Sequence, residues 1–112
     1  MLVQGVAGGR AVDESLEPVL LAGHRATALA LVFSELLGNA LEHGGGHVRV
    51  DLHRDNGEVV LAISDAGRGI EGAASDGTGL SIVRALVRDE LRGTFELTGD
   101  AGTRAEVRFS PA

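Results

Sequence analysis

One segment, residues 26–42, does most to fix what this chain can fold into. Its apolar side chains recur every three or four positions, which is the period of a helix that packs one face on a core. Three consecutive glycines, Gly44 to Gly46, then stop the pattern. The apolar positions that predict this core-packed helix are Leu29, Ala30, Phe33, Leu36, Leu37, Ala40 and Leu41.

The segments that follow the helix read as strands. Residues 48–53 alternate between apolar and polar side chains, as in a strand that is exposed on one side. Asp55-Asn56-Gly57 predicts a hairpin turn, because Asn-Gly tolerates the positive φ that such turns require. The next strand should cover residues 58–64 and place Asp65 at its end.

A second helix is expected over about residues 78–91, with Gly93 ending it. The tail then alternates in residues 94–98 and again in residues 103–109, so that apolar side chains of both segments face one side. The sequence therefore predicts a closing hairpin.

The start of the chain is harder to assign. Residues 2–6 have weak strand character, and an acidic stretch, residues 13–17, leads into an apolar run, residues 19–22. We expect a strand or two with a loop. Helices separated by antiparallel hairpins predict the α+β class, as a two-layer sandwich with a mixed sheet covered on one face by helices. A length of 112 residues fits a single domain, residues 1–112.

Composition excludes several functions. The chain has no cysteine, which excludes disulfides and thiol catalysis and makes a cytoplasmic location the expectation. All ten basic residues are arginines, so a P-loop with its lysine is excluded. A net charge of −6 disfavours nucleic-acid binding. The longest apolar stretch, residues 26–33, is much shorter than the roughly 20 residues of a bilayer span, so no membrane insertion is expected.

The first candidate site lies within the predicted helix, where Glu35 and Asn39 are one turn apart. A solvated helix face is one interpretation, but asparagine is a poor interior helix former and is better explained here as a ligand. Its amide oxygen suits Mg²⁺, which binds nucleotides through one or two protein groups. Glu35 could act as a base or hold a metal-bound water. His43, at the helix end, either lies near phosphates or complements the helix dipole.

The second candidate site is Asp65-Ala-Gly67-Arg-Gly69. Asp65 is in phase with the core residues of its strand, and a partly buried carboxylate needs a partner. In the functional interpretation it accepts a hydrogen bond from the exocyclic amine of adenine, while the glycines let the backbone approach the base. A turn-capping aspartate followed by ordinary turn glycines remains the alternative.

The third candidate site is Gly77-Thr78-Gly79-Leu80, at the start of the second helix. Free backbone N–H groups and the positive end of a helix dipole would point at an anion, here the phosphates of ATP. Glycine also precedes many helices with no ligand, so the segment is a weak signal when taken alone.

Together, the three segments resemble the ATP-binding domain of bacterial sensor histidine kinases, within the superfamily that also includes gyrase and the MutL mismatch-repair proteins. Residues 35–43 are similar to its N box, residues 65–69 to its G1 box and residues 77–83 to its G2 box. The resemblance covers about residues 27–109 and implies the Bergerat fold, a helical layer on a mixed sheet.

The resemblance also implies roles for single residues. It implies Asn39 on Mg²⁺, Glu35 as the N-box acid and Asp65 on adenine. The glycines that it implies shape the base and phosphate sites are Gly67, Gly69, Gly77 and Gly79. Glu42 stands where many relatives have a lysine, and residues 71–76 leave only a short ATP lid, which looks most like variant kinases with a different dimerisation domain.

The expected function is that of a histidine kinase catalytic domain. It would bind Mg-ATP and donate the γ-phosphate to a histidine on a dimerisation domain absent from this chain, for transfer to a response regulator. Low activity is expected in isolation. His24, His47 and His53 are expected at exposed positions in turns or on strand exteriors, with no role. Two alternatives stay open: a serine kinase of the anti-sigma-factor type, and a degenerate nucleotide-binding or docking module.

Overall fold

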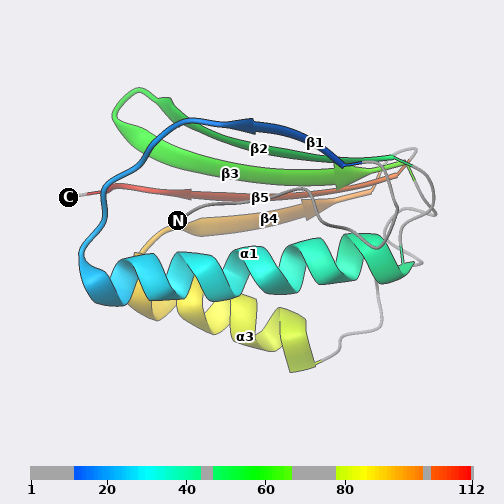
Figure 1. Cartoon of the computed structure of the whole chain (residues 1–112). Coiled ribbons are helices and arrows are strands. Elements are labelled where there is room, and N and C mark those ends of the chain that lie inside the picture. The colour runs from blue at the N-terminus through cyan, green and yellow to red at the C-terminus, as the bar shows by residue number, and fades with distance from the viewer. Residues whose placement is uncertain (1–11, 44–46, 67–77, 100–101, 112) are drawn as a thin grey trace.

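The computed structural model describes residues 12–43, 47–66, 78–99 and 102–111. Within them, five strands form one sheet in the order β1-β2-β3-β5-β4, and helices α1 and α3 cover one of its faces (Figure 1). Strand β1 is parallel to β2, and the other neighbouring strands are antiparallel. The predicted two-layer α+β sandwich with a mixed sheet is therefore confirmed. The elements are β1 (Val12–Leu16), α1 (Gly23–His43), β2 (Val48–Asp55), β3 (Glu58–Asp65), α3 (Thr78–Leu86), the π-helical turn η1 (Val87–Leu91), β4 (Thr94–Thr98) and β5 (Thr103–Phe109).

The core lies between α1, α3 and the helix-covered face of the sheet. The buried residues of β2 and β5 follow the predicted alternation. In α1 the helical period holds, but the buried face is shifted: of the predicted positions Leu29, Leu36 and Ala40 are buried, whereas Ala30, Phe33, Leu37 and Leu41 are half-buried, and Ala28 and Val32 are buried without having been predicted. Each large apolar side chain buried in this way contributes about 1.5–3 kcal/mol. The buried core residues from α1, β2, β3 and β5 are Ala28, Leu29, Val32, Leu36, Ala40, Val48, Val50, Leu52, Val59, Leu61, Ile63, Ala105, Val107 and Phe109.

The hairpin between β2 and β3 turns at the predicted place. Asn56 and Gly57 both have positive φ, 52° and 82°. This is the requirement of a type I′ turn, which Asn-Gly meets with little strain. The turn sets the register that pairs Asp55 with Glu58 at one end of the hairpin and Val48 with Asp65 at the other.

The face of the sheet away from the helices, here called the open face, carries charged side chains. Val60 and Ala62 of β3 are nevertheless buried there. The register places Arg108 directly opposite Val60, and a long side chain of this kind covers apolar surface with its stem. The guanidinium Nη1 of Arg108 lies 3.0 Å from Asp55 Oδ2 and 3.4 Å from Glu58 Oε1. Among the described residues, charged side chains and no helix lie over the open face.

The start of the chain has the expected strand with a loop, and the structure places them. The acidic stretch itself forms β1, whereas residues 19–22 form no strand, and residues 2–6 lie outside the described residues. An edge strand needs only the backbone ladder to β2, and charged side chains are usual on such edges. His47 contacts Asp13 across this pairing, and its hydrogen bond holds the pKa of the Asp13 carboxyl below its ordinary value.

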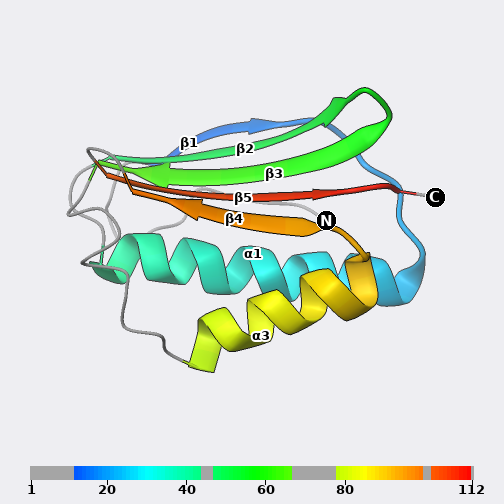
Figure 2. The same cartoon turned by 180° about the vertical axis from the view of Figure 1, so that it is seen from behind.

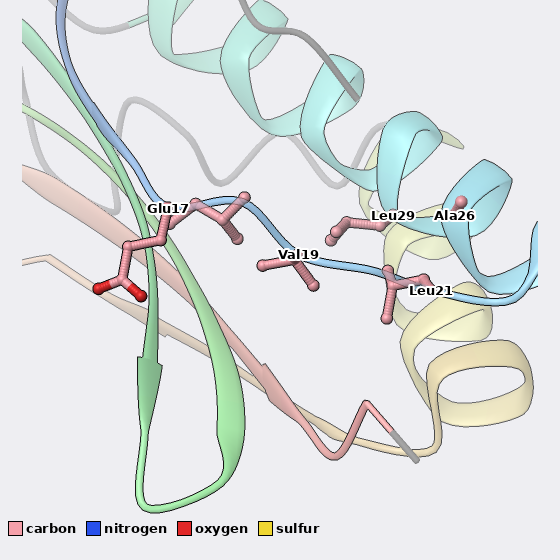
Figure 3. A pocket seen from close by; sticks show the side chains of 6 residues that line it. Glu17, Val19, Leu21, Ala26 and Leu29 are labelled. Atoms are coloured by element: carbon pink, nitrogen blue, oxygen red, sulfur yellow. The ribbon is translucent and has the colours of Figure 1, made fainter.

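The apolar run in residues 19–22 connects β1 to α1. Val19 and Leu21 are half-buried and turn toward α1 and the sheet, whereas Leu20 is 90% exposed. Figure 3 shows Val19 and Leu21 beside Leu29, at a small hollow of about 40 Å³. Val19 and Leu21 are apolar because they cover the edge of the core. Covering the core requires no hydrogen bonding to a neighbouring strand.

The second helix also differs from the prediction in its last turn. The α-helical part ends at Leu86, and a π-helical turn continues to Leu91. The wider turn keeps Val87 and Leu91 buried in the core. The helical segment ends at Leu91 as predicted, but its C-cap is Arg92, which adopts a left-handed conformation with φ 54°, and the predicted terminator Gly93 follows that cap.

None of the helices formed by the described residues combines the length and the apolar character that crossing a bilayer requires.

Arg25, in the first turn of α1, ties three elements together. Its Nη2 donates to the carbonyl oxygen of Leu91 at 2.7 Å and to that of Ser110 at 2.6 Å. The guanidinium also lies 5.3 Å from the centre of the Phe109 ring. One side chain therefore links the start of α1 to the end of η1 and to the end of β5.

We expect Arg25→Ala to lower the free energy of unfolding by about 2 kcal/mol, because it removes two charge-assisted hydrogen bonds and a cation–π contact. Urea unfolding followed by circular dichroism measures the change. The matched control is Arg54→Ala, since Arg54 is exposed and its side chain makes no hydrogen bond to other described residues. If Arg25→Ala lowered the free energy of unfolding no more than Arg54→Ala does, the proposed stabilising role of Arg25 would be contradicted.

Candidate functional site

The elements that carry the described site residues meet toward one end of the molecule. The carboxyl end of α1, the end of β3 and the start of α3 lie on the same side in both views (Figures 1 and 2). We call this the Asp65 end. The opposite end, with the β2–β3 turn and the start of α1, is called the hairpin end. The antiparallel β2–β3 pair spans the two ends, so that the turn fixes which residue reaches the Asp65 end.

A direct contact between two predicted motifs joins α1 to α3. Glu35 Oε2 occupies the place that a Cβ atom of residue 79 would take. Glu35 is half-buried, and among the described residues its carboxylate has no hydrogen bond and no ion pair. The contact places a carboxylate with an unused hydrogen-bonding capacity beside the first turn of α3.

Asn39 lies one turn further along α1 and is half-buried. Its side-chain amide makes no hydrogen bond to other described residues, so the oxygen can accept a metal ion. In the described part of the chain, no three acidic or histidine side chains come together as metal ligands. That donor set fits a magnesium ion held mainly by phosphates and water with one protein oxygen, and does not fit a metal held by the protein alone.

Asp65 is the last residue of β3 and is half-buried. Its neighbours Val48 on β2 and Thr103 on β5 fix its backbone on both sides. Alternation along β3 places its side chain on the same face as Ile63, the face covered by the helices. The Asp65 carboxylate therefore lies on the face of the sheet that is covered by α1, the helix that carries Glu35 and Asn39. The alternation of apolar residues along the strand predicts this side.

Gly102 is a residue that the sequence analysis missed. It is buried, has φ +135°, and a Cβ atom on it would overlap the carbonyl oxygen of Asp65. Only glycine is suited to this backbone conformation and this close approach. The sequence signal was a glycine in a predicted turn, which does not reveal that the turn closes on the end of β3.

The amino end of α3 supplies backbone donors. Thr78 is its first residue and Gly79 its second, and the first N–H groups of a helix have no partner within the helix. Leu80 is only 6% exposed and its side chain packs in the core, so any contact it makes with a ligand would be through its backbone. His43 is the last residue of α1. The predicted site residues Gly67, Gly69 and Gly77 lie outside the described residues.

The three other histidines have ordinary surroundings. His24 lies in the first turn of α1 and not in a turn before it, which corrects the prediction, because the helix begins at Gly23. His47 contacts Asp13, and His53 Nδ1 lies 2.7 Å from Asp51 Oδ1. Both pairs join neighbouring positions on the open face of the sheet.

Comparison with known proteins decides the family. The sequence model for the family described as histidine kinase-, DNA gyrase B- and HSP90-like ATPase matches residues 24–112. The chain belongs to this family. The predicted resemblance to the ATP-binding domain of histidine kinases is therefore confirmed.

Two proteins with similar sequences are named as histidine kinases. The sensor histidine kinase PdtaS of Mycolicibacterium smegmatis is 38% identical over 86 residues, which cover 68% of this chain and 17% of that protein. The histidine-protein kinase AfsQ2 of Streptomyces coelicolor is 45% identical over 42 residues, which cover 38% of this chain and 8% of that protein. The chain thus spans less than a fifth of the length of these relatives.

Solved structures share the fold. The blue-light activated histidine kinase of Erythrobacter litoralis EL346 superposes with a TM-score of 0.82 at 26% identity, covering 93% of this chain and 36% of that one. The catalytic domain of the histidine kinase ThkA superposes with a TM-score of 0.74 at 19% identity, covering 90% of this chain and 79% of that one. The mixed sheet with its helical layer is the Bergerat fold of this family of ATP-binding domains.

Proposed function

We propose that residues 1–112 form a single domain that binds Mg-ATP at the Asp65 end and donates the γ-phosphate to a histidine on a separate dimerisation domain, from which it would pass to a response regulator. The observation that carries the proposal is the contact between Glu35 and Gly79, at the end of the molecule where β3 delivers Asp65. It brings together two motifs whose residues suit a nucleotide phosphate chain. Family membership supports ATP as the nucleotide.

Each predicted residue has a role in this proposal. Asp65 accepts a hydrogen bond from the amine of adenine, and the backbone N–H groups of Gly77, Thr78, Gly79 and Leu80 face the phosphates. His43 lies near the phosphates, and Gly67 and Gly69 let the backbone approach the base. Asn39 would hold the magnesium ion, which neutralises phosphate charge when bound. Glu35 takes the proton of the attacking group as a general base.

In transfers of this kind the protein mainly positions the reacting groups and stabilises charge. This chain holds its candidate base on α1 and its candidate phosphate donors on α3, and the two helices pack directly on each other. The acceptor histidine would come from the partner domain, so we expect the chain alone to bind nucleotide and to turn it over slowly.

Asn39→Ala is expected to remove most of the increase in ATP affinity that magnesium produces, a loss of about tenfold, because the ion loses its protein ligand. Calorimetric titration of ATP with and without Mg²⁺ measures this difference. Ser34→Ala, at an exposed position of the same helix, is the control and should behave as the wild type. The same magnesium dependence in Asn39→Ala and the wild type would contradict the role of Asn39.

The two alternatives make different products. A serine kinase of the anti-sigma-factor type would label a serine of a protein substrate, whereas the proposed kinase labels a histidine. Incubation with γ-labelled ATP and each kind of acceptor separates them, because phosphohistidine is lost in acid and phosphoserine survives. A degenerate docking module would bind a partner without binding any adenine nucleotide. We expect acid-labile label on the histidine acceptor only.

A further inference from the structure

The glycine at position 79 has no backbone reason to be a glycine. The residue lies in the first turn of α3 and is not among the described glycines with positive φ, which are Gly57 and Gly102. In a regular helix alanine is more favourable than glycine. The reason for glycine at this position must therefore be found in what surrounds it.

The nearest surroundings are the side chain of one residue. The three heavy atoms nearest to a Cβ at position 79 all belong to Glu35: Oε2, which it would overlap, Cδ at 3.1 Å and Cγ at 3.9 Å. The end of the Glu35 side chain thus lies against the Cα atom of Gly79. The space that a larger residue would fill is taken by the carboxylate.

We propose that Gly79 is a positioning residue for Glu35. Its missing side chain lets the carboxylate lie against the first turn of α3, beside the backbone N–H groups expected to face the phosphates. The negative charge is favoured there by the positive end of the helix dipole. That this position matters for turnover rests on the proposed function, whereas the contact itself does not.

The substitution that tests the contact should leave the fold intact. An alanine Cβ at position 79 meets the far end of a long side chain, and Glu35 can rotate away from it. The same change at Gly93 or Gly102 would meet a backbone carbonyl oxygen, which cannot move so easily. Gly38→Ala is a matched control on the helix that carries Glu35, because a Cβ there meets nothing within 4 Å.

The first experiment uses the nucleotide-free 112-residue chain. In the wild type we expect nuclear Overhauser contacts between the Hγ atoms of Glu35 and the Hα atoms of Gly79. In Gly79→Ala these contacts should disappear and the carboxyl carbon resonance of Glu35 should shift, while the amide resonances of residues remote from α3 stay as in the wild type. In the control Gly38→Ala, the contacts between Glu35 and Gly79 should remain. Contacts and carboxyl resonance unchanged in a folded Gly79→Ala protein would overturn the proposal.

The second experiment measures phosphate release from Mg-ATP by the same chain. Loss of a general base costs about 100-fold in Glu35→Ala, and a misplaced base in Gly79→Ala costs about tenfold. If Gly79 acts through Glu35, the double variant should be no slower than Glu35→Ala alone. Losses that multiply would overturn the positioning role. A wild-type chain that binds no ATP would instead refute the proposed function, and the nuclear Overhauser result would still decide the contact.

Discussion

Gly93→Ala should destabilise the domain by about 3 kcal/mol. Gly93 lies between η1 and β4, directly against β5. A Cβ atom there would overlap the carbonyl oxygen of Arg108 and lie 2.7 Å from the Cβ atom of Phe109. Neither can move alone, since Arg108 is paired to Val60 and Thr94 and Phe109 is buried in the core.

The backbone N–H of Gly93 adds to this constraint, because it donates to the carbonyl oxygen of Val87 at 3.0 Å and closes the π-helical turn. Relief by moving Gly93 would therefore break the end of η1. Urea unfolding of Gly93→Ala should show a free energy of unfolding lower by this amount, while the slope of that free energy against urea concentration stays the same as in the wild type. Gly38→Ala should instead stabilise by about 0.5–1 kcal/mol, since alanine is favoured in an open helix position. Equal stabilities of the two variants would show that this close approach is absent.

Asp65→Asn should weaken ATP binding about tenfold, because a hydrogen bond to a charged acceptor contributes about 1.5–3 kcal/mol and one to a neutral amide oxygen about 0.5–1.5 kcal/mol. The substitution keeps the size of the side chain and removes its charge. The backbone at this position is held by β2, β5 and the close approach of Gly102, so the replaced side chain cannot recover the contact by a shift of the strand.

Calorimetric titrations of ATP and GTP into the wild type and Asp65→Asn measure this effect. The wild type should prefer ATP, since guanine presents an oxygen where adenine presents its amine, and the variant should lose most of that preference. Asp89→Asn is the control, because Asp89 is exposed near the hairpin end and paired with Arg88. An ATP affinity in Asp65→Asn equal to that of the control would remove Asp65 from the adenine site.

Local patterns sufficed for the elements that border the site. The helical period around Leu36 predicted α1, and Asn56-Gly57 predicted the turn that sets the β2–β3 register. Alternation then predicted that β3 ends at Asp65. In each case the signal lies within a few residues of the feature, because periodicity and turn chemistry depend on near neighbours.

Features that depend on distant contacts were missed. β1 lies in an acidic stretch because its partner is the backbone of β2, which leaves no apolar pattern in its own residues. The roles of Gly93 and Gly102 depend on Arg108 and on Asp65, which only the folded sheet brings close. The contact of Glu35 with Gly79 joins two motifs that the sequence showed separately.

The central claim is that the segments around Asn39, Asp65 and Gly79 line one nucleotide site. A titration of the isotope-labelled chain with Mg²⁺ and a non-hydrolysable ATP analogue tests it most directly, through the amide resonances. We predict that the perturbed amides cluster at the Asp65 end, in the second half of α1, at the end of β3 and at the start of α3, while Gly57 and Arg92 keep their resonances. Perturbations centred on the hairpin end, or none at saturating nucleotide, would contradict it.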